Sequence, residues 1–299
     1  MFEINSQLRP GTSRNNNSWH FRTIGMGTVN YRKAGLRLAA EAASTGLFSS
    51  SLGVSERFLK EKSPNFWHKH HRILRPQLPG FGWWIWKPEF IRVCLEMIPE
   101  NHGLLYLDAG SWISQQSRDL ATVSTFFELA TTETLLGSNS QNFIEEEYCS
   151  TEMMDLLGLD DNKRKSNQFH AGFLIIINNK KGREFVASWS ELLCKDEHKY
   201  LLHRGSAETP DLVLRHHMYD QAVFSCLMKK NNVTSVPTGD RSNEGVIRAI
   251  RHRYAYAVDE TNRFKIAYYN FLHFLSRIRL YFLRRFNRNH LLIESHEYK

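Results

Sequence analysis

Residues Gly80 to Ser111 read GFGWWIWKPEFIRVCLEMIPENHGLLYLDAGS, and this stretch decides the fold more than any other part of the chain. Three tryptophans and a Lys-Pro step precede an apolar helical segment, which leads into a strand expected over Leu104 to Leu107. The strand ends on Asp108, followed by a small residue and a glycine. Open α/β sheets bind ligands at the carboxyl ends of their strands. The stretch therefore predicts a ligand site at Asp108, beside aromatic faces and the cation of Lys87.

The composition is that of a folded, basic protein. With 299 residues, 41% hydrophobic and 23% charged, the chain is long enough for one large domain or a domain with an appendage. The formal net charge of +8 suggests an anionic partner. Nucleic acid, a phosphate-bearing ligand and a membrane surface are the three classes that this charge allows.

The cysteines and the N-terminus indicate the compartment. Four widely spaced cysteines without a CxxC pair predict free thiols in a reducing cytoplasm, and neither a zinc site nor a disulfide framework is expected: Cys94, Cys149, Cys194 and Cys226. Asn5 to Ser18 is polar, so residues 1–18 are expected to form a flexible lead-in without the apolar core of a cleaved signal. No apolar run is long enough for a membrane-spanning helix.

Hydrophobic periodicity alternates between strand and helix over residues 19–260. Strands are expected over His20–Gly27, Leu47–Val54, Leu104–Leu107, Thr134–Gly137 and Phe169–Ile177, and helices over Tyr31–Ser44, Ser55–Glu61, Asp119–Ala130, Tyr148–Leu157, Lys181–Cys194 and Asp220–Lys230. Ser63 to Pro79 reads as an exposed loop. This order predicts a three-layer α/β/α sandwich around a mostly parallel central sheet.

The tail, residues 261–299, differs in character. Thr261 to His290 contains seven positive charges and no acid, interleaved with aromatic residues. An apolar face forms at helical spacing from Phe271, Leu275, Ile278 and Phe282. A basic amphipathic helix of this kind suits the surface of an anionic bilayer. Packing on the domain with a solvated basic face is the alternative.

A Gly-x-Gly turn at Gly25 and Gly27 follows the first strand. It is a weak signal for a dinucleotide-binding or methyltransferase-type enzyme, because the third glycine of that motif is missing, and the pattern favours a plain tight turn between strand and helix. Backbone amides at this turn, where the helix near Tyr31 begins, could bind a phosphate. The cations on the following helical turn could neutralise a diphosphate or form a solvated face: Arg32, Lys33 and Arg37.

Other polar residues have competing interpretations. Asp108 could be an oxygen ligand for a divalent cation, an acceptor for a sugar hydroxyl, or a helix cap. A single Asp provides too few ligands for a hard cation. The residue two positions on is Gly110, so no second carboxylate follows. His170 precedes Ala171 and Gly172, whose small size lets a ligand approach. Asp220 and Gln221 open a helix. They could act as a base or as an acceptor-binding pair, or the charge of Asp220 could complement the helix dipole.

The remaining histidines are expected to be ordinary loop residues. His68, His70 and His71 form a cluster in sequence that could bind a metal, but no acid or cysteine lies near them in the chain. His216, His217 and His252 have the same default interpretation.

Together these motifs resemble the glycosyltransferases of the GT-A, nucleotide-diphospho-sugar transferase fold, in the order of family 8 and the capsular-polysaccharide-type enzymes. The segments are TIGMGTVNYRKAGLRL, GFGWWIWKP, YLDA, FHAGFLIIINN with FVASW, and YDQAVFSCL, between Phe21 and Lys230. The resemblance implies a GT-A-like catalytic domain over residues 19–260, with the basic tail as a membrane-docking helix.

The resemblance also implies roles for single residues. Asp108 matches the first acid of the family's Asp-x-Asp motif, which contacts the donor ribose and a metal, and Gly110 replaces the second acid. That replacement weakens the expectation of bound Mn²⁺ or Mg²⁺ at Asp108 and makes the cations more important for the diphosphate. His170 and Gly172 match the acceptor side, and Asp220 with Gln221 match the pair near the reacting sugar carbon.

The resulting hypothesis is a cytoplasmic glycosyltransferase, peripheral on the inner face of a membrane. It would use a UDP- or GDP-sugar and a glycan or lipid-linked acceptor, in surface polysaccharide or glycan synthesis, without binding nucleic acid. Three groups of residues are predicted to form the site: Asp108, Asp220 and Gln221 for catalysis; Gly25, Gly27, Tyr31, Arg32, Lys33, Arg37 and Lys87 for the donor; and Trp84, Trp86, Gly110, His170, Ala171 and Gly172 for the substrate. The alternatives are a methyltransferase-like α/β enzyme and a non-catalytic module that binds polyanions or membranes.

Overall fold

The central element is a six-stranded sheet with one reversed strand. The computed structural model describes residues 18–202, 214–239, 245–248 and 262–294. The strand order is β2 (Ser50–Ser55), β1 (Trp19–Gly25), β3 (Gly103–Leu107), β8 (Phe173–Ile177), β5 (Leu135–Gly137) and β9 (Thr234–Ser235). Every neighbouring pair is parallel except the two that include β8. The predicted mostly parallel sheet is confirmed.

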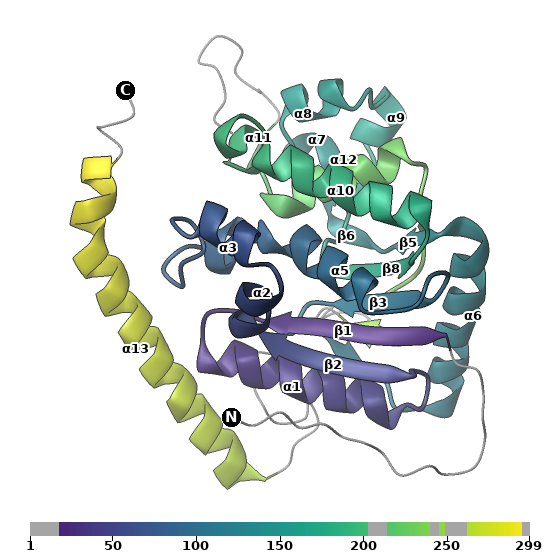
Figure 1. Cartoon of the computed structure of the whole chain (residues 1–299), viewed down its shortest axis with the longest axis horizontal. Coiled ribbons are helices and arrows are strands. Elements are labelled where there is room, and N and C mark those ends of the chain that lie inside the picture. Colours follow the sequence, from purple (N-terminus) through teal and green to yellow (C-terminus); the bar gives the residue numbers. More distant parts are fainter. Residues whose placement is uncertain (1–17, 203–213, 240–244, 249–261, 295–299) are drawn as a thin grey trace.

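Helices cover both faces of this sheet (Figure 1), which confirms the three-layer sandwich. On one face, α1 (Val29–Ser44) and α6 (Ser117–Glu133) bury Leu38 and Phe127 against Phe21 and Leu105. The other face is covered by α5 (Trp86–Glu96), α10 (Lys180–Cys194) and α12 (Asp220–Lys230). Successive residues of β8 alternate between the two cores, as the period of two in a strand requires.

Shorter elements surround the sandwich. Two-stranded sheets pair β4 (Trp112–Ile113) with β10 (Ile247–Arg248), and β6 (Asn139–Ile144) with β7 (Asn167–Phe169). The further helices are α2 (Glu56–Lys62), α3 (Pro64–His70), α4 (Gly80–Trp83), α7 (Glu145–Tyr148), α8 (Thr151–Leu156), α9 (Asp161–Arg164), η1 (Lys195–His198), α11 (Lys199–Leu202) and α13 (Arg263–Glu294).

Three expectations from the sequence were wrong in detail. Ser63 to Pro79 is not an exposed loop: Pro64 opens α3, and His70 and Leu74 are buried. The helix expected over Tyr148 to Leu157 is broken, because the buried Cys149 is extended and separates α7 from α8. The strand expected over Phe169 to Ile177 is interrupted between β7 and β8, which belong to different sheets.

The tail forms the helix α13 beside α1 (Figure 1). Many of its described large apolar side chains are exposed, among them Phe264, Phe271 and Phe282. No helix within the described ranges has the length and apolar character needed to cross a membrane. The helix itself was predicted, and a position against the domain was one of the two alternatives for it.

Candidate active site

A pocket of about 820 Å³ opens at the carboxyl ends of β1 and β3. The turn after β1 and the residues after β3 form one part of its lining. The start of α5, the segment before it and the start of α12 form another. This is the edge at which an open α/β sheet binds its ligands.

The reversed direction of β8 completes this edge. Leu107 of β3 pairs with Phe173 of β8, so the residues before β8 lie beside those after β3. The amide of Asp108 donates to the carbonyl of Gly172 at 2.9 Å. A Cβ on Gly172 would stand 2.9 Å from Asp108 Oδ2 and 2.6 Å from His170 Cε1, so a larger residue there would displace these two side chains. A parallel β8 would have placed His170 at the opposite edge of the sheet.

An ammonium ion between two carboxylates forms the floor of the pocket. Lys87 Nζ lies 3.2 Å from Asp108 Oδ1 and 3.1 Å from Asp220 Oδ2, and it donates to the carbonyl of Ala171 at 3.3 Å. The side chains of Lys87 and Asp220 are 3% and 5% exposed, whereas that of Asp108 is 33% exposed. Tyr106 Oη donates to Asp108 Oδ1 at 2.6 Å. Asp108 is therefore the member of the group that faces the pocket most openly.

Burial and charge shift the pKa values of this group. Burial raises the pKa of Asp220 to about 7, and Lys87 counteracts part of that rise. Burial also disfavours the charged form of Lys87, but Asp108 and Asp220 outweigh it and raise the pKa of the amine. Burial and Asp108 raise the pKa of Tyr106 well above its usual range. Near neutral pH the site thus holds an ammonium, a phenol and a carboxyl group able to gain or lose a proton.

The aromatic wall of the pocket is built on a left-handed turn. Gly80, Phe81, Gly82, Trp83 and Trp84 all have positive φ, between 52° and 98°. For residues with a side chain this conformation costs about 1–2 kcal/mol each. Trp86 Nε1 holds the turn by donating to the carbonyl of Gly80 at 2.8 Å. Strained backbone of this kind concentrates at functional sites, and here it places Phe81 and Trp84 in the pocket lining.

The N-terminus of α1 forms a second wall that adjoins the aromatic one, since a Cβ on Gly27 would lie 3.0 Å from Phe81 Cδ2. Gly27, with φ of +86°, and Thr28 line the pocket, and the Thr28 hydroxyl caps the helix by accepting from the Tyr31 amide at 3.4 Å. A Cβ on Gly25 would collide with the Tyr31 carbonyl, so the turn requires glycine there. No acid occupies the first turn of α1. The dipole and the backbone amides at the N-terminus of a helix are suited to a phosphate.

Most predicted site residues meet in this pocket. Its lining includes Gly27, Tyr31, Trp84, Trp86, Lys87, Asp108, Gly110, His170, Gly172, Asp220 and Gln221. Gly25 and Ala171 lie directly beside lining residues without lining it themselves.

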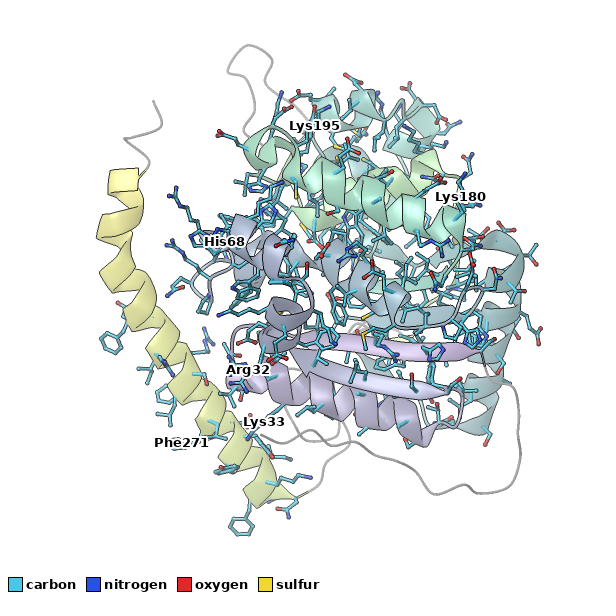
Figure 2. All side chains as sticks on the ribbon, in the orientation of Figure 1. Arg32, Lys33, His68, Lys180, Lys195 and Phe271 are labelled. Carbon is cyan, nitrogen blue, oxygen red and sulfur yellow. The ribbon has the colours of Figure 1, made fainter. Side chains whose placement is uncertain are left out.

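The three predicted cations of α1 lie outside the lining. Arg32 forms an ion pair with Glu56, and Lys33 Nζ lies 5.4 Å from the ring centroid of Tyr269 on α13. Figure 2 shows both residues on the side of α1 that faces α13. Arg37 is buried and donates to the carbonyls of Ala109 and Ser111 at 3.2 and 3.0 Å. It therefore supports the turn after Asp108 from behind.

The structure adds lining residues that the sequence did not indicate. Ser276, Arg277 and Tyr281 of α13 line the pocket, although the tail was expected to lie outside the catalytic domain. His216 and Tyr219 line it from the segment before α12, and Tyr219 has an unusual backbone conformation with φ of 48° and ψ of −125°. No local sequence signal marks them, since their contribution depends on how distant segments pack.

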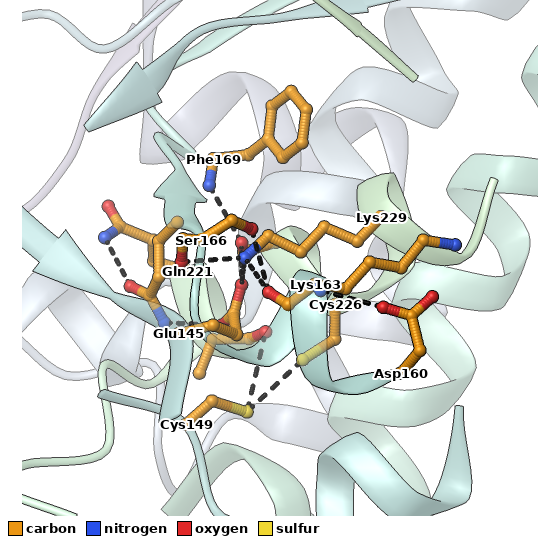
Figure 3. A network of polar contacts seen from close by, with 12 residues as sticks. Glu145, Cys149, Asp160, Lys163, Ser166, Phe169, Gln221, Cys226 and Lys229 are labelled. Carbon is orange, nitrogen blue, oxygen red and sulfur yellow. Dashed lines mark hydrogen bonds and ion pairs between the residues drawn. The ribbon is translucent and has the colours of Figure 1, made fainter. Parts of the chain in front are cut away.

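A buried network determines how Gln221 is oriented (Figure 3). Lys229 Nζ pairs with Glu145 Oε2 at 2.9 Å, and Glu145 Oε1 accepts from Gln168 Nε2 at 2.8 Å. Because an ionised carboxylate only accepts, the Gln168 amide must turn its oxygen the other way. That oxygen accepts from Gln221 Nε2 at 2.9 Å. The Glu145 charge thereby fixes which end of the Gln221 amide points away from Gln168.

A resident divalent ion does not fit the donor set at Asp108. Hard cations bind several oxygen ligands, whereas Lys87 already lies against both carboxylates and Gly110 contributes no side chain. Within the described ranges, groups of three potential ligands occur at His70, Cys194 and His198 and at Glu145, Cys149 and Cys226, not at Asp108.

Comparison with known proteins gives structural similarity only. No protein-family model and no curated protein matches the chain. Mouse xyloside xylosyltransferase 1 in its apo form is similar with a TM-score of 0.43 at 9% identity, covering 80% of this chain and 99% of that one. The galactosyltransferase LgtC, in complex with donor and acceptor sugar analogues, gives 0.43 at 13% identity, covering 85% and 94%. The bifunctional glycosyltransferase WbbM gives 0.39 at 12% identity, covering 90% and 45%.

These three structures are glycosyltransferases. At these identities and TM-scores the function has to be inferred from the pocket itself.

Proposed function

We propose that this protein is a glycosyltransferase that moves a sugar from a nucleotide-diphosphate donor to a glycan or lipid-linked acceptor. The observation that supports this most is a large pocket whose lining brings the partly exposed carboxylate of Asp108 together with the N-terminus of α1 and the guanidinium of Arg277. Sugar transfer releases a diphosphate, and stabilising the developing negative charge is its main electrostatic requirement. The pocket volume of about 820 Å³ falls within the usual range for small-molecule sites.

The two walls suggest a division of the pocket. In this proposal the donor phosphates bind the amides at the N-terminus of α1, and Asp108 accepts hydrogen bonds from hydroxyl groups of the donor. Phe81 and Trp84 provide apolar faces for a base or a sugar ring. The acceptor binds near His170 and Gln221, on the far side of Asp108. Asp220, with its pKa of about 7, is able to exchange a proton with the reacting groups.

The positive charge comes from the chain's own side chains in this proposal. Lys87 is already engaged with two carboxylates, so it leaves the group with a net negative charge when both are ionised. Arg277 is the cation of α13 that lines the pocket. It is suited to a phosphate because a guanidinium can donate two parallel hydrogen bonds.

The test is a screen of UDP- and GDP-sugars for transfer and hydrolysis, with the Asp108→Asn variant. We expect this variant to lose turnover by about 10²–10³-fold, as for the loss of one stabilising group in an active site. Asp155→Asn is the matched control, because Asp155 is exposed, pairs with Arg164 and lies outside the pocket. Normal turnover by Asp108→Asn would contradict the proposal. Thermal stabilisation by S-adenosylmethionine instead of UDP or GDP would favour the methyltransferase alternative.

We further propose that α13 holds the enzyme against an anionic membrane surface. Phe264 and Phe271 are 90% and 57% exposed, and the exposed cations Arg263, Lys265 and Arg279 share the helix. Figure 2 labels Phe271 on this helix. An amphipathic helix of this composition binds anionic interfaces in a salt-dependent way. Co-sedimentation with anionic but not zwitterionic vesicles, weakened in Phe271→Glu, is expected; equal recovery with both vesicle types would contradict it.

A further inference from the structure

Three metal-binding side chains meet outside the pocket. His70 ends α3, Cys194 ends α10 and His198 ends η1, and one potential ligand atom from each lies within 4.8 Å of the others. None of the three lines the pocket described above. In Figure 2 the labels of His68 and Lys195 mark the two segments that supply them. The meeting of His70 with Cys194 could not be predicted from the sequence, because the two residues are 124 positions apart.

The separation of two of these atoms matches shared coordination. His70 Nε2 lies 3.6 Å from Cys194 Sγ. In a tetrahedral zinc site with Zn–N of about 2.0–2.1 Å and Zn–S of about 2.3 Å, a nitrogen and a sulfur ligand stand about 3.6 Å apart. His70 is 5% exposed, and its ring forms a hydrogen bond with the Cys194 sulfur.

His198 is held in the orientation of a metal ligand. A backbone carbonyl can only accept, so His198 Nδ1 donates to the Leu193 carbonyl at 3.0 Å. Ligating histidines usually donate one ring nitrogen to a backbone carbonyl in this way and bind the metal through the other. The backbone before it is strained, because Asp196, Glu197 and His198 all have positive φ, from 47° to 70°. Bonds to a metal would offset that cost.

The second cluster of potential ligands provides a contrast. Glu145 lies with Cys149 and Cys226, but its carboxylate already pairs with the Lys229 ammonium and accepts from Ser225 and Gln168. That site contains its own cation. At His70 the neighbouring ammonium belongs to Lys69, which is exposed and can stay in solvent.

We propose that His70, Cys194 and His198 bind one Zn²⁺, with water as the fourth ligand. Thiolate and imidazole ligands favour Zn²⁺ over Mg²⁺ and Ca²⁺, and Cys194 and His198 are partly exposed, which leaves room for the water. Binding releases the thiol proton of Cys194. The ion joins α3 to the end of α10, and α3 leads into Pro76 to Phe81, the wall of the pocket. The proposed site lies outside the pocket and is separate from the sugar-transfer chemistry.

Metal analysis of the purified full-length protein tests this proposal. We expect about one equivalent of zinc per chain after dialysis, and less than about a tenth of that in Cys194→Ser and His198→Ala. His68→Ala and His71→Ala are matched controls on the same segment, both exposed and outside the cluster, and should keep the zinc. Replacement by Co²⁺ should give a thiolate-to-cobalt charge-transfer band that Cys194→Ser lacks.

Two results would overturn the proposal. One is wild-type protein that neither retains zinc nor gives the cobalt band. The other is zinc that stays bound in Cys194→Ser and His198→Ala. Circular dichroism of the variants shows whether they fold, and His198→Ala offers a partly exposed position where a collapse of the core is not expected. A chelator should lower the melting temperature of the wild type and leave that of folded Cys194→Ser unchanged. UDP binding is a separate measurement, so failure of the glycosyltransferase proposal would leave this one standing.

Discussion

Replacing Lys87 with methionine removes the ammonium between two carboxylates and keeps a side chain of similar length. Nζ lies 3.1 Å from Asp220 Oδ2, and both side chains are almost fully buried. At an effective dielectric constant of about 20, two unit charges at this distance attract by about 5 kcal/mol. Removing one partner of a buried pair leaves the other uncompensated and costs about 3–5 kcal/mol. We expect the free energy of unfolding at about pH 8 to fall by that amount.

The loss should depend on pH in a defined direction. Asp220 has a folded pKa of about 7 and a usual value of 3.8. Between these values the folded protein keeps a proton that the unfolded chain has released, so stability decreases as pH rises through this window. Without Lys87 the pKa of Asp220 rises further and the decrease continues to higher pH. At about pH 5 Asp220 is neutral in both proteins, and the difference in stability should shrink to about 1–2 kcal/mol from the remaining contact with the partly exposed Asp108.

Urea unfolding followed by tryptophan fluorescence at the two pH values measures this. The double variant Lys87→Met, Asp220→Asn provides the control, because it removes both charges of the buried pair. It should recover at least half of the loss at about pH 8. A loss below about 1 kcal/mol at both pH values, or a double variant no more stable than the single one, would refute this account of the pocket floor.

Three further predictions test the walls and the charge of the pocket. Gly82→Ala should lower the free energy of unfolding by about 2 kcal/mol or more, because its Cβ would lie 2.6 Å from the Ile73 carbonyl. Gly46→Ala, with open space around it, should lower it by about 1 kcal/mol. Equal losses in urea unfolding would contradict this. Arg277→Ala should weaken UDP binding about tenfold in calorimetry while Arg279→Ala, outside the lining, leaves it unchanged. UDP binding near neutral pH should take up a proton, seen as a dependence on buffer ionisation enthalpy that Asp220→Asn abolishes; uptake that persists in Asp220→Asn would assign the proton to another group.

The sequence pattern predicted those helices and strands whose ends are set by residues close to them in the chain. The start of α12 at Asp220, the capping of α2 by Ser55 and the end of α1 before Gly46 all depend on residues within one or two turns. The strand ending at Asp108 was equally readable, since Leu104 to Leu107 is a short apolar run bounded by a turn. These elements fixed the sheet edge at which the pocket lies. For that reason most of the predicted site residues meet in one pocket.

Features that depend on distant partners could not be predicted. The direction of β8 is set by its antiparallel pairing with β3 and β5. An apolar run predicts a buried strand but not the direction in which that strand crosses the sheet. The left-handed turn over Gly80 to Trp84 needs a surrounding structure that outweighs its strain, which the sequence GFGWW does not reveal. The position of α13 beside α1 depends on packing across the whole chain. The cluster of His70 with Cys194 joins segments that are far apart in sequence.

The charges of the pocket explain why α13 matters to the proposed chemistry. Asp108, Asp220 and Lys87 carry a net negative charge when Asp220 is ionised and none when it is protonated. A nucleoside diphosphate adds negative charge, so its binding favours the protonated form, and a pKa of about 7 makes that change cheap near neutral pH. The remaining charge has to be met at the rim, by the amides of α1 and by Arg277. Because Arg277 belongs to the same helix as the exposed Phe271, whatever binds the apolar face of α13 also acts on the position of a donor-binding cation.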